Sequence, residues 1–406
     1  MADSRRARLG VNRLRAVAVA CLLVVPLGVG ACSSAASNDA GADRDCITEF
    51  DANTDYFPNK STITDASGLS IEYHKSYQVM TVKEPMAGAA PVSYVLVRCG
   101  APAPRLDGAL ADAPQVQVPI RTMYSGSTTH LPAMAALGAA DTVTGVSSAD
   151  YVSTPEIRSR IDAGQVKQYA DAGVPNVERV IAARPDVLVS DGYEDASLAK
   201  LRQAGVTVLS DADWLENGPL GRAEWIKFFA ALTGREKKAA DVFDEVKRDY
   251  NAVATKVANA PKTDVLLGGI ENGAWTMAAG GSYFGRIIRD AHGEYPWAGD
   301  QSTGSARLSI ESVIDRSRNA DAWILSDMTV NSLAELYQQD ERYRVFAQPA
   351  KQAWNSTKAV SETGGNDYFE RGVLRPDLVL GDVAAVLHPE LFPDHDFAFY
   401  RQLPAQ

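Results

Sequence analysis

Residues 225–258 read WIKFFAALTGREKKAADVFDEVKRDYNAVATKVA and carry the strongest helical pattern in the chain. Apolar side chains recur there at intervals of three and four residues, first over 225–232 and again, after a Thr-Gly break, over 242–253. The second helix is expected from about Arg235 to Ala258, which is roughly 35 Å long at about 1.5 Å per residue. A helix of this length can join two lobes.

Strand and helix signals alternate on both sides of this helix, which indicates α/β architecture. One series runs from Ile120 to Leu209, and a second begins at Val265. Residues 176–189 and 309–325 follow the same plan: a helix-capping residue, a short helix, an aspartate and a buried strand. We therefore expect two similar α/β lobes, one before and one after the long helix.

The composition argues against several classes of protein. The 406 residues are 46% hydrophobic and 22% charged, with a formal net charge of −11. An acidic balance argues against nucleic-acid binding, which needs clustered Lys and Arg, and the apolar content argues against disorder. The one long apolar run lies at the N-terminus, so a polytopic membrane protein is not expected.

The first 31 residues predict a secretory signal. Five Arg precede an uncharged run from Ala16 to Ala31, which is short for a transmembrane helix and is interrupted by Pro and Gly. The run leads into Val-Gly-Ala-Cys, which resembles a bacterial lipobox and implies lipidation of Cys32. Because residues 1–31 carry a net charge of +4, their removal changes the formal charge from −11 to −15.

A short β-rich section is expected after the signal. Residues 70–73, 77–82 and 93–97 read as strands separated by Gly and Pro turns. Cys46 and Cys99 are left as an even pair in an exported chain, which predicts a disulfide. A two-Cys metal site is the alternative, but no His or Cys neighbour completes it.

The predicted organisation has six parts. Small polar residues after the signal are typical of a flexible tether, and several prolines mark the passage into the main body. In chain order we expect a signal peptide (1–31), a tether (32–45), a β-rich extension (46–118), an N-terminal lobe (119–219), connecting helices (220–260) and a C-terminal lobe (261–406).

A set of short motifs occurs in order between about Arg121 and Leu403. They are RTMYSGSTTHL (121–131), the unit 176–189, LRQAGVTVL (201–209), GSYFG (281–285), AHGE (291–294), LSIE (308–311) and RPDLVL (375–380). In this order they resemble the ABC-transporter substrate-binding lipoproteins that capture ferric siderophores, haem or cobalamin. One departure is His292, which stands where that family usually has Gly.

The resemblance implies a class III periplasmic-binding fold, with two Rossmann-like lobes joined by one long helix and the ligand between them. It implies a monomeric binding protein rather than an enzyme, without a cofactor, exported and lipid-anchored to the outer face of the bacterial cytoplasmic membrane. Its expected partners are an ABC permease with its ATPase and a small iron complex, a ferric siderophore first and haem or cobalamin as alternatives. By position, Glu194 and Glu294 are expected to dock on the permease, Glu294 with the more closely matching motif; the alternative is that both are ordinary surface glutamates.

The ligand-binding residues are expected on loops at strand ends, where the two lobes converge. Aromatic side chains there can stack on a planar or chelated ligand, and core packing is an equally good interpretation of each. An Arg suits ligand carboxylates or catecholates, although the acidic balance favours a neutral or cationic iron complex. The candidates are Tyr124, Ser127, Thr128, Tyr151, Tyr193, Trp214, Trp275, Tyr283, Trp354, Tyr368 and Arg371.

Other chemistries have less support. Residues 280–285 (GGSYFG) miss the G-x-S-x-G pattern of a serine hydrolase by one residue, and the sequence shows no nucleotide-binding glycine motif. The five His are scattered, and the densest group, from His388 to Asp396, is interpreted as a solvated tail, so no direct metal site is expected. His130 with a cleft tyrosine can ligate haem iron, which leaves haem open.

Overall fold

The computed structural model describes residues 46–192, 195–346 and 352–405. The signal peptide, the tether and the lipidation site Cys32 expected from the sequence lie outside these residues. Within the described ranges, no helix combines the length and apolar character needed to cross a membrane.

The described chain starts with a small sheet of strand order β1-β2-β3-β4, antiparallel except for the parallel β3–β4 pair. Met80, Val82, Tyr94 and Leu96 alternate along two of its strands and join the core of the following lobe, so one face of the sheet is buried. The expected Cys46–Cys99 disulfide is present. The elements are β1 (Leu69–Tyr73), β2 (Tyr77–Val82), β3 (Val92–Arg98), η1 (Gly108–Leu110) and β4 (Gln115–Val118).

A five-stranded parallel sheet forms the N-terminal lobe, in the order β11-β10-β5-β6-β7. Every residue of β5 and β10 is buried, as expected for a parallel sheet covered on both faces. Its strands are β5 (Met123–Ser125), β6 (Val143–Val146), β7 (Lys167–Gln168), β10 (Val187–Ser190) and β11 (Val208–Ser210), beside the hairpin β8 (Ala170–Asp171) and β9 (Val174–Pro175). Its helices are α1 (His130–Ala136), η2 (Ala140–Thr142), α2 (Pro155–Asp162), α3 (Val177–Ala183) and α4 (Ala196–Gln203).

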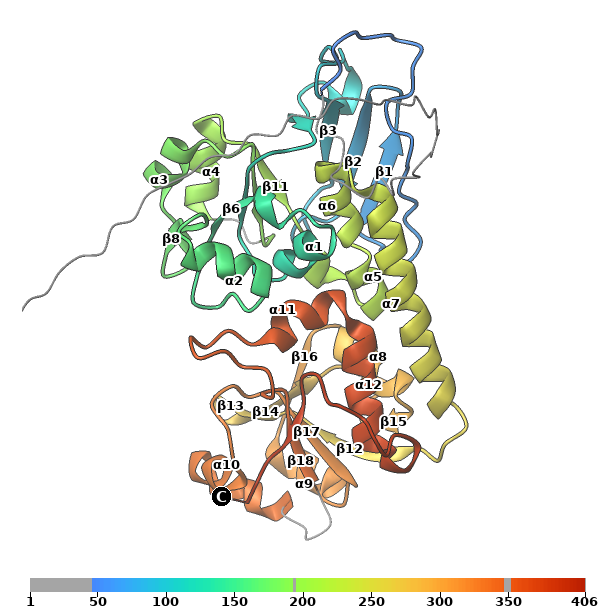
Figure 1. Cartoon of the computed structure of the whole chain (residues 1–406). Coiled ribbons are helices and arrows are strands. Elements are labelled where there is room, and N and C mark those ends of the chain that lie inside the picture. The colour runs from blue at the N-terminus through green and yellow to red at the C-terminus, as the bar shows by residue number, and fades with distance from the viewer. Residues whose placement is uncertain (1–45, 193–194, 347–351, 406) are drawn as a thin grey trace, which may run out of the picture. The chain divides into compact units, whose positions relative to one another are not determined.

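Three helices join this lobe to the next: α5 (Pro219–Ala223), α6 (Ile226–Thr233) and α7 (Glu236–Val257), after the short turn η3 (Asp213–Leu215). Gly234 ends α6 in a left-handed conformation, with φ of 66°. The first half of α7 places Phe243 and Val246 in the core of the N-terminal lobe, whereas Tyr250 and Val257 belong to the second core. One helix is therefore shared by both cores, and Figure 1 shows α7 running from the first lobe to the second.

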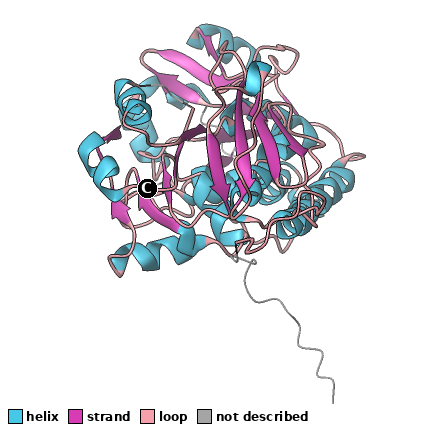
Figure 2. Cartoon of the chain, turned by 90° about the horizontal axis from the view of Figure 1, so that it is seen from above, coloured by secondary structure: helices cyan, strands magenta, loops and turns pink. Residues whose placement is uncertain are grey.

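The C-terminal lobe holds a mixed sheet in the order β15-β12-β17-β18-β19 and a smaller antiparallel sheet, β13-β14-β16. In Figure 2, where the chain is seen from above, helices lie around the strands. The strands are β12 (Thr263–Leu267), β13 (Gly269–Glu271), β14 (Ala274–Ala278), β15 (Gly293–Glu294), β16 (Ser305–Leu308), β17 (Ala322–Leu325), β18 (Gln352–Asn355) and β19 (Arg401–Gln402). The helices are α8 (Tyr283–Asp290), α9 (Ile310–Ser317), α10 (Leu333–Gln339), η4 (Glu341–Phe346), α11 (Asp367–Leu374), α12 (Pro376–Leu387) and η5 (Pro389–Leu391).

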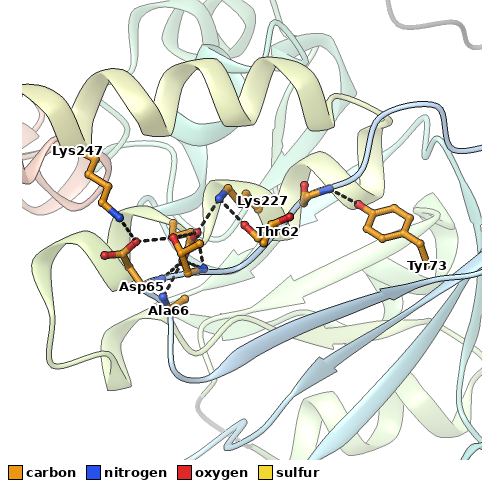
Figure 3. A network of polar contacts seen from close by, with 9 residues as sticks. Thr62, Asp65, Ala66, Tyr73, Lys227 and Lys247 are labelled. Atoms are coloured by element: carbon orange, nitrogen blue, oxygen red, sulfur yellow. Dashed lines mark hydrogen bonds and ion pairs between the residues drawn. The ribbon is translucent and has the colours of Figure 1, made fainter.

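The β-rich extension is attached to the connecting helices through two buried carboxylates. Glu224 accepts hydrogen bonds from the backbone N–H groups of residues 64–66 and pairs with Lys227 at 2.6 Å. Glu216 accepts from the backbone N–H groups of residues 67–68 and from the indole N–H of Trp225. Figure 3 shows the network around Lys227. The extension therefore contacts the segment that links the lobes.

The structure confirms the expected α/β class with two lobes joined by a long helix. The described residues belong to one compact unit, from Cys46 onward. The domain boundaries proposed from the sequence therefore stay predictions.

Candidate functional site

A cavity of about 740 Å³ lies between η3 and the C-terminal lobe. Its floor is formed where the parallel strands β12 and β17 end, at Leu267 and Leu325. Such carboxyl ends are the usual place for a ligand in an α/β sheet. Gly268 lets β13 and β14 fold back over this edge, because a Cβ added there would fall 2.0 Å from the Thr276 carbonyl oxygen.

Aromatic side chains from several elements line this cavity. Trp214 comes from η3, Tyr283 and Phe284 from α8, and Tyr368 and Phe369 from α11. Phe369 is 45% exposed, so its ring can receive a ligand. Stacking on such rings suits a large planar or chelated molecule.

Two of these tyrosines are held in place by their neighbours. The Tyr283 hydroxyl donates to the carbonyl of Gly372 at 3.3 Å, and the Arg222 guanidinium lies 5.4 Å from the ring centroid. The Tyr368 ring packs edge-on against Tyr400. Burial raises the pKa of both Tyr283 and Tyr368, so both phenols are neutral at physiological pH.

Three of the predicted ligand-binding residues, Trp214, Tyr283 and Tyr368, line the cavity. Trp275 is fully buried and donates to the Leu267 carbonyl, and Trp354 stacks on Phe397 at 4.6 Å between ring centroids. Neither indole is among the groups that line the cavity.

The predicted residues of the first lobe lie apart from this cavity. Tyr124 is buried against Tyr169, and Tyr151 is 60% exposed. Ser127 accepts a hydrogen bond from the Thr129 hydroxyl, and Thr128 precedes α1, where its carbonyl accepts from the Leu131 N–H.

The remaining predictions concern charged residues and the pair Tyr193 and Glu194. Arg371 donates to Asp367 at 2.7 Å and lies over Phe399, outside the cavity. Glu294 is exposed on β15 and lies 3.3 Å from Lys262. Tyr193 and Glu194 fall outside the described residues.

Several lining residues were not singled out from the sequence, among them Phe284, Phe369 and Thr276. Thr276 stands between two inward-facing neighbours on β14, and its buried hydroxyl finds no hydrogen-bond partner among the described residues. Asp327 and Met328 follow the fully buried strand β17, on one of the strand-end loops where ligand-binding residues were expected. Phe369 directly follows the predicted ligand-binding residue Tyr368, and this position is the sequence signal that could have identified it.

A buried Ser-His-Asp arrangement lies in the first lobe, but it cannot act as a catalytic triad. His130 Nδ1 is 2.9 Å from the Ser125 hydroxyl and its Nε2 is 3.5 Å from Asp211. Burial lowers the pKa of His130 to about 3 and raises that of Asp211. Ser125 is 1% exposed and donates to the Ser127 carbonyl, so its hydroxyl is not available to a substrate.

A contact between α11 of the C-terminal lobe and the residues before α2 joins the two lobes. The Glu370 carboxylate accepts from the backbone N–H of Ser153 at 2.8 Å and from that of Thr154 at 2.7 Å, and both hydroxyls also donate to it. Thr154 is the residue at the N-cap position of α2, so the Glu370 carboxylate lies at that helix N-terminus. Burial raises the pKa of Glu370, while the bonds from Thr154 and Ser153 oppose that shift. Residues 153–154 and α11 are thus joined by hydrogen bonds.

Comparison with known proteins identifies the family. The family described as periplasmic binding protein matches residues 124–363, more than half of the chain, and the chain belongs to it. Its members bind solutes and deliver them to ABC transporters, so the protein is an extracytoplasmic binding protein and not an enzyme.

Relatives agree with this assignment. An uncharacterized lipoprotein of Methanocaldococcus jannaschii is 30% identical over 248 residues, which cover 60% of this chain and 58% of that protein. The iron-uptake system-binding protein of Bacillus subtilis is 30% identical over 97 residues, 23% of this chain and 28% of that protein. The triscatecholate siderophore-binding protein FeuA of Bacillus subtilis, solved with ferri-bacillibactin, shares the fold with a TM-score of 0.51 at 16% identity, covering 70% of this chain and 98% of FeuA.

Proposed function

We propose that the protein binds a ferric chelate, of the siderophore class, and delivers it to an ABC permease. The observation that carries this proposal is the cavity of about 740 Å³ with aromatic walls at the ends of β12 and β17. Its size and its rings suit a preformed complex. Among the described residues, no group of three or more His, Cys, Asp or Glu is placed to hold a bare metal ion.

Two relatives support iron as the cargo. The iron-uptake system-binding protein of Bacillus subtilis matches part of the sequence, and FeuA, which binds a ferric siderophore, shares the fold. The exported lipoprotein character is supported by the Cys32 motif and by the archaeal lipoprotein relative. Mass spectrometry of the membrane-bound protein tests this point, because Cys32→Ser should abolish a lipid adduct on the N-terminal peptide.

Titration with ferric siderophores, followed by tryptophan fluorescence, tests the binding function. We expect saturable quenching, because Trp214 lies in the wall of the cavity. Trp214→Phe should remove most of the quenching, whereas Trp354→Phe should retain it, since that indole stacks on Phe397 outside the cavity. The proposal fails if no ferric chelate binds saturably.

A further inference from the structure

The charged residues around the cavity are all of one sign. The residues that line it include Glu216, Glu271 and Asp327, and within residues 46–192, 195–346 and 352–405 no Lys or Arg lines it. A low-dielectric cleft with charges of one sign concentrates ligands of the opposite sign. The wall therefore disfavours an anionic ligand.

The three carboxylates are not equivalent. Glu216 is 4% exposed, and both its oxygens accept hydrogen bonds from Ser67, Gly68 or Trp225, so it serves to hold the extension. The side chain of Glu271 is exposed and makes no ion pair with any described residue. Its charge is therefore available to a ligand.

Asp327 is fixed in place and still has a free oxygen. Its Oδ1 accepts from the backbone N–H of Thr329 at 2.8 Å and from the Thr329 hydroxyl at 2.6 Å. The side-chain amide of Asn355 fixes the backbone of Asp327, because it accepts a hydrogen bond from the Asp327 N–H and donates one to the Asp327 carbonyl. Oδ2 accepts no hydrogen bond from the described residues. The carboxylate is therefore preorganised at the end of β17.

Two features of opposite sign lie nearby, and neither cancels these carboxylates. Arg222 lies 5.4 Å from the Tyr283 ring centroid, outside the cavity, and its Nε is 3.5 Å from Asp213, which offsets its charge. The N-terminus of α8 reaches the cavity at Ser282. A helix terminus is equivalent to roughly half a charge and its first N–H groups are partly capped, so two formal charges outweigh it.

Apolar and aromatic surface completes the wall. Met328 and Phe369 are 44% and 45% exposed, and Trp214 lies in the same wall. Aromatic faces attract cations through their quadrupoles, and nearby carboxylates add to that attraction. Rings and carboxylates together therefore favour a cationic ligand with an apolar surface.

We propose that the cleft selects a ferric complex with a positive or zero net charge, as ferric hydroxamates have, and that Asp327 and Glu271 determine this specificity. This inference rests on the proposed function. Three singly charged hydroxamates neutralise Fe(III), and an ammonium group on the chelator leaves a net positive charge. Three doubly charged catecholates leave a net charge of minus three, which Asp327 and Glu271 would repel. The protein thus differs in ligand class from FeuA, whose fold it shares.

The test compares chelates that differ in charge on the full-length protein. Cationic ferrioxamine B, neutral ferrichrome, anionic ferric enterobactin and haemin are titrated by tryptophan fluorescence and calorimetry, at low and high salt. We expect ferrioxamine B to bind at least about tenfold more tightly than ferric enterobactin, with a difference that shrinks as salt rises. Asp327→Asn and Glu271→Gln should each weaken ferrioxamine B roughly threefold to fivefold and leave ferrichrome unchanged.

Asp315→Asn is the matched control, because Asp315 is exposed on α9, outside the cavity, and the change in net charge is the same. It should leave all affinities unchanged. If ferric enterobactin binds as tightly as ferrioxamine B, the charge inference fails while the proposed function stands. If none of the four complexes binds, both fail. The comparison on the unaltered chain holds even where a variant does not fold.

Discussion

Glu236 shows how a single buried carboxyl group affects the stability of this molecule. It lies in the first turn of α7, is 6% exposed and lines a second cavity beside the extension. Burial raises its pKa from 4.5 to about 7, although its own backbone N–H, Arg98 and Gln78 oppose the shift. The folded protein therefore holds the proton more tightly than the unfolded chain does.

We expect the free energy of unfolding to depend on pH because of this residue. The pKa of Glu236 is higher in the folded protein than in the unfolded chain, so ionising this residue destabilises the fold. This loss in the free energy of unfolding is absent below about pH 4.5 and grows until the pH passes 7. Glu236→Gln should remove this part of the dependence and stabilise the protein at pH 8 by up to roughly 3 kcal/mol. Urea denaturation at pH 5 and pH 8 measures it.

Glu245→Gln is the matched control, since Glu245 is exposed on the same helix. It should leave the pH dependence as it is. An unchanged slope between pH 5 and pH 8 in Glu236→Gln would contradict the assignment.

Residue identity alone did not separate cleft aromatics from core aromatics. On β14 the side chains alternate, so Trp275 and Met277 face the core while Thr276, between them, is only half-buried. A shift of one residue in register would exchange these roles, and the sequence of a five-residue strand does not fix that register. Trp214, in contrast, lies in a short turn between a buried strand and a helix and lines the cavity, while its contact with a ligand stays a prediction.

At the scale of elements, helical periodicity predicted the connection between the lobes well. The long helix, expected from about Arg235 to Ala258, runs from Glu236 to Val257. The repeated helix–strand units are also present: Asn176 and Ser309 cap α3 and α9 by accepting hydrogen bonds from backbone N–H groups. In both units an aspartate, Asp186 or Asp321, then accepts from the backbone N–H of a neighbouring strand region.

The contact between α11 and the residues before α2 belongs to this scale, and it is testable. Glu370→Gln removes the negative charge and replaces one of the two oxygens that accept hydrogen bonds from the backbone N–H groups of Ser153 and Thr154. Because a charge-assisted bond contributes about 1.5–3 kcal/mol, amide hydrogen exchange at these two residues should accelerate by roughly tenfold or more. Mass spectrometry of peptides covering 149–156 measures the change.

Glu362→Gln serves as the control, since Glu362 is exposed on the same segment. Exchange at 149–156 should not respond to it. Equal exchange rates in Glu370→Gln and the unaltered protein would show that the contact does not hold the lobes together in solution.

At the scale of the whole molecule, the extension is part of the folded unit and not an appendage. Glu224 and Glu216 on the connecting segment accept backbone hydrogen bonds from residues about 150 positions earlier in the chain. Contacts between a carboxylate and backbone N–H groups so far apart in the chain produce no periodic pattern of apolar residues in the sequence. The sequence therefore predicted the strands of the extension but not what the extension contacts.

The Cys46–Cys99 bond should contribute to stability through the chain that it closes. The two residues are separated by 53 positions, and a loop of that length corresponds to about 4 kcal/mol in the chain-entropy description. The double variant Cys46→Ser, Cys99→Ser should lower the urea midpoint accordingly. A change below about 1 kcal/mol would mean that the extension is held mainly by its noncovalent contacts.

The Glu370 contact also has a kinetic consequence. We expect a bulky chelate to need α11 and the first lobe to part, which requires this carboxylate to release the amides of Ser153 and Thr154. The observed association rate should then rise with chelate concentration at first and level off at the rate of opening. Uptake at high supply would be limited by how often the protein opens and not by how often it meets its cargo.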